Sequence, residues 1–244
     1  MTMRHIFFRH LRLLVLTSWV ALFGLGAWAQ APAPASKHLA PGFQGLAVSE
    51  KILLMPVDVE LFSLSAGGVA EPKADWTAAA LGHMKAAIAQ KKAQLRISGV
   101  ELPEGVADEF DEQVGLHAAV ASSIALHHST GGVWALPSKA GLLDWTFGDA
   151  MKPLQGRSGA RYGLFVWVRD SYASAERKAA MVALALFGVG IPGGVQTGYA
   201  SLVDLQTGRV VWFNRLARAT GDLREAAPAK ESIEALLANF PAPQ

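Results

Sequence analysis

The sequence predicts an α+β fold, with a mixed sheet of about four strands and helices packed on it. A β-type segment at 51–62 is separated from three further β-type segments between 162 and 217. Three segments with helical periodicity lie between them, and a fourth follows the last strand. The order is therefore strand, three helices, three strands and a terminal helix, which is typical of helices covering one mixed sheet.

Residues 51–62 form the first predicted strand. Its first half is continuously apolar, as in a buried strand, and valine and leucine then alternate with acidic residues. Pro56 lacks an N–H to donate and predicts an edge position or a bulge. Residues 63–72 are small and glycine-rich, so a loop is expected there.

Three helices are expected next. Apolar residues recur at spacings of three and four over 75–95. A second helix is expected over 108–128, with Asp108 as its N-cap. A third, shorter helix is expected over 142–154, closed by Pro153.

The second half of the chain is rich in strand signals. Residues 162–170 are β-branched and aromatic. Residues 195–205 and 209–217 flank a Gln-Thr-Gly turn and predict a β-hairpin. An amphipathic helix over 231–240 closes the domain.

One apolar, glycine-rich insertion is expected at 179–194. Residues 179–191 carry no charge, but thirteen residues are too few to span a bilayer as one helix. A buried helix or hairpin arm is the simplest interpretation. The alternative is a segment that docks on a membrane or on a neighbouring subunit, where its small residues would allow close helix contact.

The first 29 residues (1–29) predict a secretory signal peptide. Three arginines precede an apolar run at 13–26, and Ala27-Trp28-Ala29 matches a signal-peptidase site. The mature protein is expected to begin at Gln30 and to be periplasmic. An uncleaved amino-terminal anchor is the alternative.

The rest of the chain is expected to hold a flexible Ala/Pro linker at 30–47 and a single domain at 48–241. The sequence has no cysteine, which excludes lipidation at a cysteine, disulfides and thiolate chemistry. The chain carries 22 basic and 20 acidic residues, and loss of the three signal arginines leaves 19 against 20. This near-neutral balance gives no support for nucleic-acid binding, so no such partner is expected.

The histidines do not define a metal site. His117 and His128 share one face of the second predicted helix but lie about 16 Å apart along its axis, too far for one metal ion. Such a site would need further ligands, such as His83 or Asp144. Capping of the helix carboxyl end is the simpler role for His127 and His128.

Other reactive residue types have simpler explanations as well. The acidic residues at 108–112 favour a helix amino terminus over an acid/base pair. The serines at 122, 123 and 129 lack the G-x-S-x-G context of a nucleophile. Residues 188–193 match G-x-G-x-x-G, but no clear strand leads into them. We therefore expect no enzyme, no catalytic residue, no cofactor and no metal.

Aromatic and basic residues are also expected to be mainly structural. Five tryptophans are most simply core residues: Trp76, Trp134, Trp145, Trp167 and Trp212. Of these, Trp134 and Trp145 flank the third predicted helix and would line a groove in an alternative interpretation. A solvated face explains the basic cluster on the first predicted helix: Lys85, Lys91, Lys92 and Arg96.

Three segments together resemble bacterial envelope domains related to the TolB amino-terminal domain and the curli secretion channel subunit. They are the opening strand at 52–57, the strand entry at 159–166 and the hairpin at 198–212, which contains V-D-x-x-T-G-x-V-V-W. The resemblance covers about 48–240 and implies a non-enzymatic role. Lipidated members carry an amino-terminal cysteine, which this chain lacks.

The leading hypothesis is a non-enzymatic periplasmic protein that acts through protein–protein contacts in cell-envelope assembly or secretion, with an envelope protein as partner. A membrane-associated oligomeric subunit that uses 179–194 is the alternative. A small periplasmic hydrolase or metal-binding enzyme around His117 and Asp144 is a second alternative.

Overall fold

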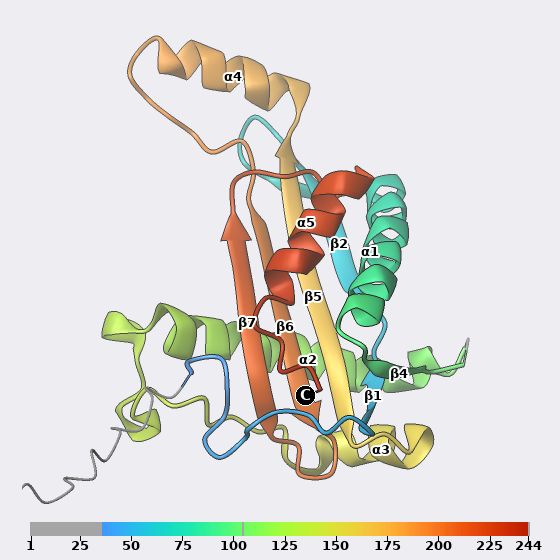
Figure 1. The fold of residues 1–244 in the computed structure, drawn as a ribbon. Helices are drawn as coiled ribbons and strands as arrows, with labels where there is room; N and C mark the ends of the chain where they lie inside the picture. The colour runs from blue at the N-terminus through green and yellow to red at the C-terminus, as the bar shows by residue number, and fades with distance from the viewer. Residues whose placement is uncertain (1–35, 104, 244) are drawn as a thin grey trace, which may run out of the picture. The chain divides into compact units, whose positions relative to one another are not determined.

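The computed structural model of this chain describes residues 36–103 and 105–243. The predicted signal peptide and its cleavage site lie outside the described residues. The described residues form one mixed, seven-stranded sheet with helices on both faces (Figure 1). The α+β prediction is confirmed, although the sheet has more strands than the four expected.

The sheet is organised around one long strand, β5 (Tyr162–Ala173). β6 (Gln196–Asp204) pairs with it antiparallel along one edge, and β7 (Val210–Arg218) pairs antiparallel with β6. The other edge of β5 carries two short strands placed end to end, β1 (Lys51–Leu54) and β2 (Asp58–Leu64), both parallel to it. The predicted hairpin at 195–217 is therefore confirmed.

The first predicted strand is broken at Pro56. The Met55 N–H still donates to the Leu164 carbonyl at 3.0 Å, but the proline cannot continue this ladder. Two short edge strands complete the sheet: β4 (Ser98–Glu101) beside β1, and β3 (Ala70–Pro72) beside β2. The expectation of only a loop over 63–72 was wrong, because three paired residues are too few to show an alternating pattern.

One face of the sheet is covered by α1 (Ala74–Gln94) and α5 (Ala226–Leu236), which lie side by side (Figure 1). Alternate β5 residues, Leu164, Val166 and Val168, point into this layer. The largest side chain buried here is Trp212, whose ring meets Phe240 edge to face at 5.2 Å. The helix predicted at 75–95 is confirmed to within one residue at each end, whereas the helix predicted at 231–240 begins five residues earlier and ends four residues earlier.

The opposite face is covered by α2 (Asp111–Ile124), α3 (Lys152–Ser158) and short turns. The turns are η1 (Ala107–Phe110), the π-type turn η2 (Ala125–Thr130), η3 (Gly132–Trp134), η4 (Pro137–Lys139) and η5 (Gly148–Met151). Phe165 and Phe213 point into this layer from the sheet.

The predicted helix over 142–154 was wrong. Thr146 instead forms a β-bridge with Arg209, and the helix begins only at Lys152. Pro153 lies in the first turn of this helix and does not end it, because a first-turn residue needs no N–H partner within the helix. The N-cap expected at Asp108 was also wrong, since this residue lies inside η1 and no side chain caps α2.

Part of the segment expected as a linker lies on the domain. The Ala40 N–H donates to the Val211 carbonyl at 2.9 Å, and the Phe213 N–H donates to the His38 carbonyl at 3.0 Å. Ala40 and Leu46 are buried. Residues 36–47 therefore extend the edge of the sheet beside β7, because their backbone groups satisfy unpaired groups of that strand.

Candidate functional site

The connection between β5 and β6, residues 174–195, is an exposed apolar part of the described chain, and we call it the arm. It contains α4 (Ala175–Ala185) and a return segment, and Figure 1 shows α4 projecting beyond the end of the sheet. The helix begins at Ser174, whose Oγ accepts a hydrogen bond from the Arg177 N–H at 3.2 Å.

The base of the arm is fixed by one buried arginine. Arg177 is 7% exposed, and its Nε and Nη2 donate to the Pro192 carbonyl at 3.0 and 2.8 Å. Its Nη1 donates to the Ser65 carbonyl at 3.3 Å, in the loop between β2 and β3. A side chain at Gly194 would lie 1.9 Å from the Ser171 carbonyl oxygen, so only glycine fits where the arm returns to the sheet.

The outer face of the arm is apolar and open to solvent. Val182 is 68% exposed, Leu186 is 82% exposed and Phe187 is 83% exposed. The interpretation of 179–194 as a buried helix or hairpin arm was therefore wrong, because no other described element covers α4. The alternative, a segment that docks on something else, remains.

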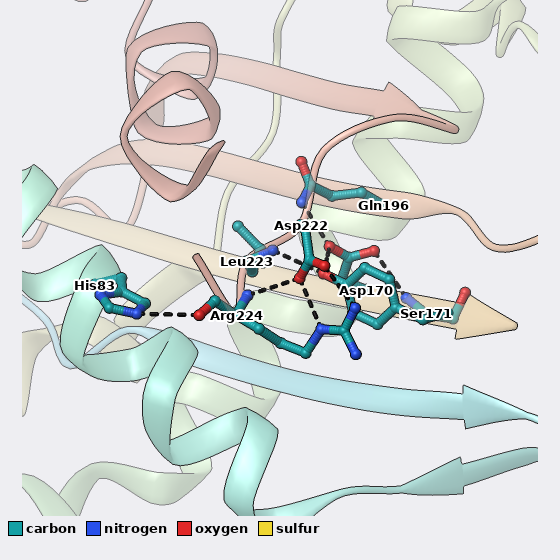
Figure 2. Close-up of polar contacts among 8 residues, drawn as sticks. His83, Asp170, Ser171, Gln196, Asp222, Leu223 and Arg224 are labelled. Carbon is teal, nitrogen blue, oxygen red and sulfur yellow. Dashed lines mark hydrogen bonds and ion pairs between the residues drawn. The ribbon is translucent and has the colours of Figure 1, made fainter. Parts of the chain in front are cut away.

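A polar network lies under the arm, at the ends of β5 and β6 (Figure 2). The carboxylate of Asp170, 3% exposed, accepts hydrogen bonds from the Tyr172 hydroxyl at 2.5 Å, the Gln196 amide at 2.7 Å and the Ser171 N–H at 2.8 Å. Burial raises the pKa of Asp170 above its ordinary value, although these hydrogen bonds act in the opposite direction.

The same network holds the loop at 219–225 against the sheet (Figure 2). The Tyr172 hydroxyl accepts a hydrogen bond from the Leu223 N–H at 2.7 Å. Arg224 pairs with Asp222, which lowers the pKa of that carboxyl, and its guanidinium lies over the rings of Trp76 and Tyr172. Burial, together with Asp170, raises the pKa of Tyr172, so the hydroxyl remains protonated as a donor.

A small cavity of about 220 Å³ lies between this network and the arm base, with Asp170, Lys178, Thr220 and Arg224 among its lining residues. The Asp170 carboxylate already accepts three hydrogen bonds from protein donors. Its evident role is to fix Gln196, where β6 begins after the arm, and, through Tyr172, the loop at 219–225 to the sheet.

A second exposed apolar surface lies after α2, and we call it the tryptophan surface: Leu126, Val133, Trp134 and Leu142. Val133 is 93% exposed and Trp134 is 56% exposed. The Trp134 carbonyl lies 2.7 Å from His127 Nδ1, which fixes the short turn that carries the indole. Trp134 was expected in the core or a groove, and the structure places it at the surface.

The candidate hydrolase residues are not brought together. His117 is 2% exposed, its Nε2 lies 2.9 Å from the buried Ser201 Oγ, and its ring stacks on Phe165 at 4.9 Å. Burial lowers the pKa of His117 to about 3, so the imidazole is neutral. Asp144 is exposed and lies 3.8 Å from Lys139, with no bond to the histidine.

The rings of two other histidines, His128 and His83, lie beside backbone carbonyls of distant residues. His128 Nε2 lies 2.7 Å from the Lys37 carbonyl, and His83 Nε2 lies 3.2 Å from the Arg224 carbonyl. His127 and His128 lie in the last turn of the helix, which is the position the capping prediction requires, but their ring nitrogens lie beside the Trp134 and Lys37 carbonyls and not beside carbonyls of the helix itself. Ser122 and Ser123 donate to the Ala119 carbonyl of their own helix.

The acidic residues at 108, 109, 111 and 112 are exposed in the first turns of η1 and α2, as the helix-terminus interpretation predicts. The G-x-G-x-x-G match at 188–193 lies in the return segment of the arm and precedes β6. Among residues 36–103 and 105–243, no three histidine or carboxylate side chains gather as a metal-binding group.

Sequence reasoning did not find the polar network. Asp170, Gln196 and Asp222 come from β5, β6 and the loop after β7, with no motif that links them. The only sequence signal was the presence of polar residues at the ends of otherwise apolar strands.

The described part of the chain is thus an α+β domain with two exposed apolar surfaces. No protein-family model matches the chain, and no curated protein matches it. Several solved structures are similar to it at low identity. The PelC dodecamer from Paraburkholderia phytofirmans is 15% identical with a TM-score of 0.37, over 83% of this chain and 96% of that chain.

The lipoprotein GNA1162 from Neisseria meningitidis is 13% identical with a TM-score of 0.32, over 78% of this chain and 97% of that chain. The carboxyl-terminal domain of LpoB from Salmonella enterica is 12% identical with a TM-score of 0.29, over 73% and 87% respectively. The resemblance to the TolB and curli type stays a prediction.

Proposed function

We propose that this protein is a non-enzymatic periplasmic protein that acts by binding another protein in cell-envelope assembly or secretion. The periplasmic location rests on the amino-terminal sequence. The observation that carries the proposal is the tryptophan surface, where a large aromatic side chain is exposed on a fixed turn. Tryptophan is enriched among the residues that dominate binding energy at protein interfaces.

The tryptophan surface has the composition of a protein interface. Its apolar residues are accompanied by polar groups: Lys139 lies over the Trp145 ring at 5.2 Å, and Arg215 donates to Thr130 at 2.7 Å. An apolar centre with a polar rim is the usual arrangement at protein–protein contacts. Because the turn is fixed before binding, little side-chain and loop freedom is lost on association.

The placement of the reactive residues supports a role without catalysis. A close histidine–serine pair, His117 and Ser201, is enclosed in the core between α2 and β6. A nucleophile must reach its substrate, and neither side chain contacts solvent to a useful extent. The pair instead satisfies two buried polar groups, which is a structural role.

The proposal is tested by photo-crosslinking in cells that express the full chain. A photoactivatable residue replaces Val133, and a control replaces Ala86, which is exposed on α1. We expect one adduct of fixed mass from position 133 that disappears when Trp134→Ala is added, and none from position 86. An adduct of twice the monomer mass identifies a second copy as the partner. Equal, Trp134-independent labelling at both positions contradicts the proposal.

A further inference from the structure

We propose that the arm docks on a lipid bilayer, with the end of α4 entering the apolar part of one leaflet. This inference goes beyond the proposed function, because it concerns a different surface and a different class of partner. It rests on the composition of the exposed face, the closure of the helix end, and the length of the arm.

The face of α4 that points to solvent is apolar. At about 100° per residue, Ala179, Val182, Ala183, Leu186 and Phe187 cover the outer half of the helix, and all are exposed. A surface helix normally places charged or polar residues on that half. Here the last exposed charge before the tip is on Lys178, at the base.

The inner side of the arm is already occupied by its own return segment. The Met181 methyl group lies 3.2 Å from the Cβ position of Gly193, and Arg177 binds the Pro192 carbonyl. The arm therefore does not need to fold back on the sheet to bury its inner face. The outer apolar face therefore makes no contribution to the packing of the domain.

Backbone hydrogen bonds satisfy carbonyl groups at the carboxyl end of α4, which favours an apolar environment. The Val189 N–H donates to the Leu184 carbonyl at 3.1 Å, and the Gly188 N–H donates to the Ala185 carbonyl at 3.0 Å. With Gly188 at a φ of 74°, these two bonds form a Schellman motif. Free carbonyl groups at a helix end are costly in hydrocarbon, and this motif satisfies two of them.

The length of the arm fits one leaflet. From Lys178 to Ala185 the helix rises about 10 Å at 1.5 Å per residue, and the turn at 186–188 extends the arm further, whereas half of a hydrocarbon core of about 30 Å is about 15 Å. Within the described ranges, no helix combines the length and apolarity that crossing a membrane requires. Val69, in the loop between β2 and β3, and Val195, the last residue of the arm, are also exposed.

Lipid explains the arm better than a protein partner does. A protein interface combines apolar contacts with about one hydrogen bond per 100–200 Å². The arm offers no charged or hydrogen-bonding side chain from 179 to 191, whereas the turns around the tryptophan surface also carry Thr130 and Lys139. A protein socket would have to enclose half of the helix and its tip, while acyl chains surround such a shape without directional contacts.

The test uses residues 30–244, which include all of the compact unit 36–244, and vesicles of phosphatidylethanolamine and phosphatidylglycerol. The chain has no cysteine, so Phe187→Cys and the control Val133→Cys each take one environment-sensitive fluorophore. We expect vesicles to shift the emission of the label at 187 to shorter wavelength and to leave the label at 133 unchanged.

A second measurement uses unlabelled protein and flotation with the same vesicles. Leu186→Ser with Phe187→Ser should reduce the bound fraction about tenfold or more, since two large apolar side chains lose their burial. The matched pair Val133→Ser with Trp134→Ser should bind as the unchanged protein does. All four positions are exposed, so folding is retained.

Two results would overturn the inference. One is a label at 187 that does not respond to vesicles. The other is a label at 187 that shifts with protein concentration in their absence, because the arm would then be buried against a second copy. Neither result bears on the proposed function, which is tested at positions 133 and 134.

Discussion

The buried imidazole of His117 makes the stability of this protein depend on pH. It is 2% exposed, and burial lowers its pKa from 6.5 to about 3. As the pH falls below 6.5, the unfolded chain takes up a proton that the folded protein does not accept until about pH 3. The free energy of unfolding therefore falls over this window and is highest, as far as this residue is concerned, above pH 6.5.

The magnitude follows from the width of the window. Each pH unit between the two pKa values costs about 1.4 kcal/mol. Between pH 7 and pH 5 this residue therefore lowers the free energy of unfolding by about 2 kcal/mol.

Replacement of this histidine by leucine separates burial from titration. His117→Leu removes the proton uptake but leaves the Ser201 hydroxyl, 0% exposed, without its partner. An unsatisfied buried hydroxyl costs about 1–3 kcal/mol, so the variant should be less stable at pH 7. By pH 5 the unchanged protein has lost about as much, and the two free energies of unfolding should converge.

The measurement is urea unfolding at pH 7, 6 and 5, followed by tryptophan fluorescence, with linear extrapolation to water. Other titrating groups are common to both proteins and cancel in the difference. His117→Leu with Ser201→Ala serves as the control, because it removes the orphaned hydroxyl and should recover most of the loss at pH 7. A difference between His117→Leu and the unchanged protein that is constant from pH 7 to pH 5 would refute the reasoning.

Two further changes test the packing around the arm and the sheet. Gly194→Ala would place its Cβ 1.9 Å from the Ser171 carbonyl oxygen and should lower the free energy of unfolding by about 1–3 kcal/mol or more. The control Gly190→Ala places its Cβ in open space and should change the free energy of unfolding little. The urea midpoints of the two variants distinguish these outcomes. Asn214→Ala removes an amide that donates at 3.0–3.3 Å to three carbonyls at the carboxyl end of α5. It should cost about 1–3 kcal/mol and increase amide hydrogen exchange in α5, and unchanged exchange there would contradict the capping role.

Local patterns in the sequence predicted the elements whose signals are strong and continuous. The hairpin at 195–217 combines alternating apolar residues with a turn whose Gly208 has a φ of 69°, so its register follows from short-range geometry. The periodic helices at 75–95 and 231–240 were found for the same reason. The helix predicted over 142–154 was wrong because Pro153 marks a first turn as readily as a last one, and the helix begins only at Lys152.

For the candidate surfaces too, the sequence shows the composition of a segment and only the structure shows its exposure. The apolar run at 179–191 was visible in the sequence, but whether it is buried depends on which elements lie against it, and the sequence does not encode that locally. Arg177 is the residue that holds the arm away from the core, through carbonyls 112 and 15 residues distant in the chain. No single-residue pattern predicts such a contact.

By itself, the sequence determined the order of the main elements, the absence of cysteine chemistry and the uncharged insertion, because composition and periodicity act over a few residues. Only the tertiary structure decided that Arg177 fixes the arm base, that His117 is a neutral core residue, and that Trp134 and Phe187 face outward. These properties depend on desolvation and on contacts between distant segments, which exist only once the sheet and its two helical layers have assembled.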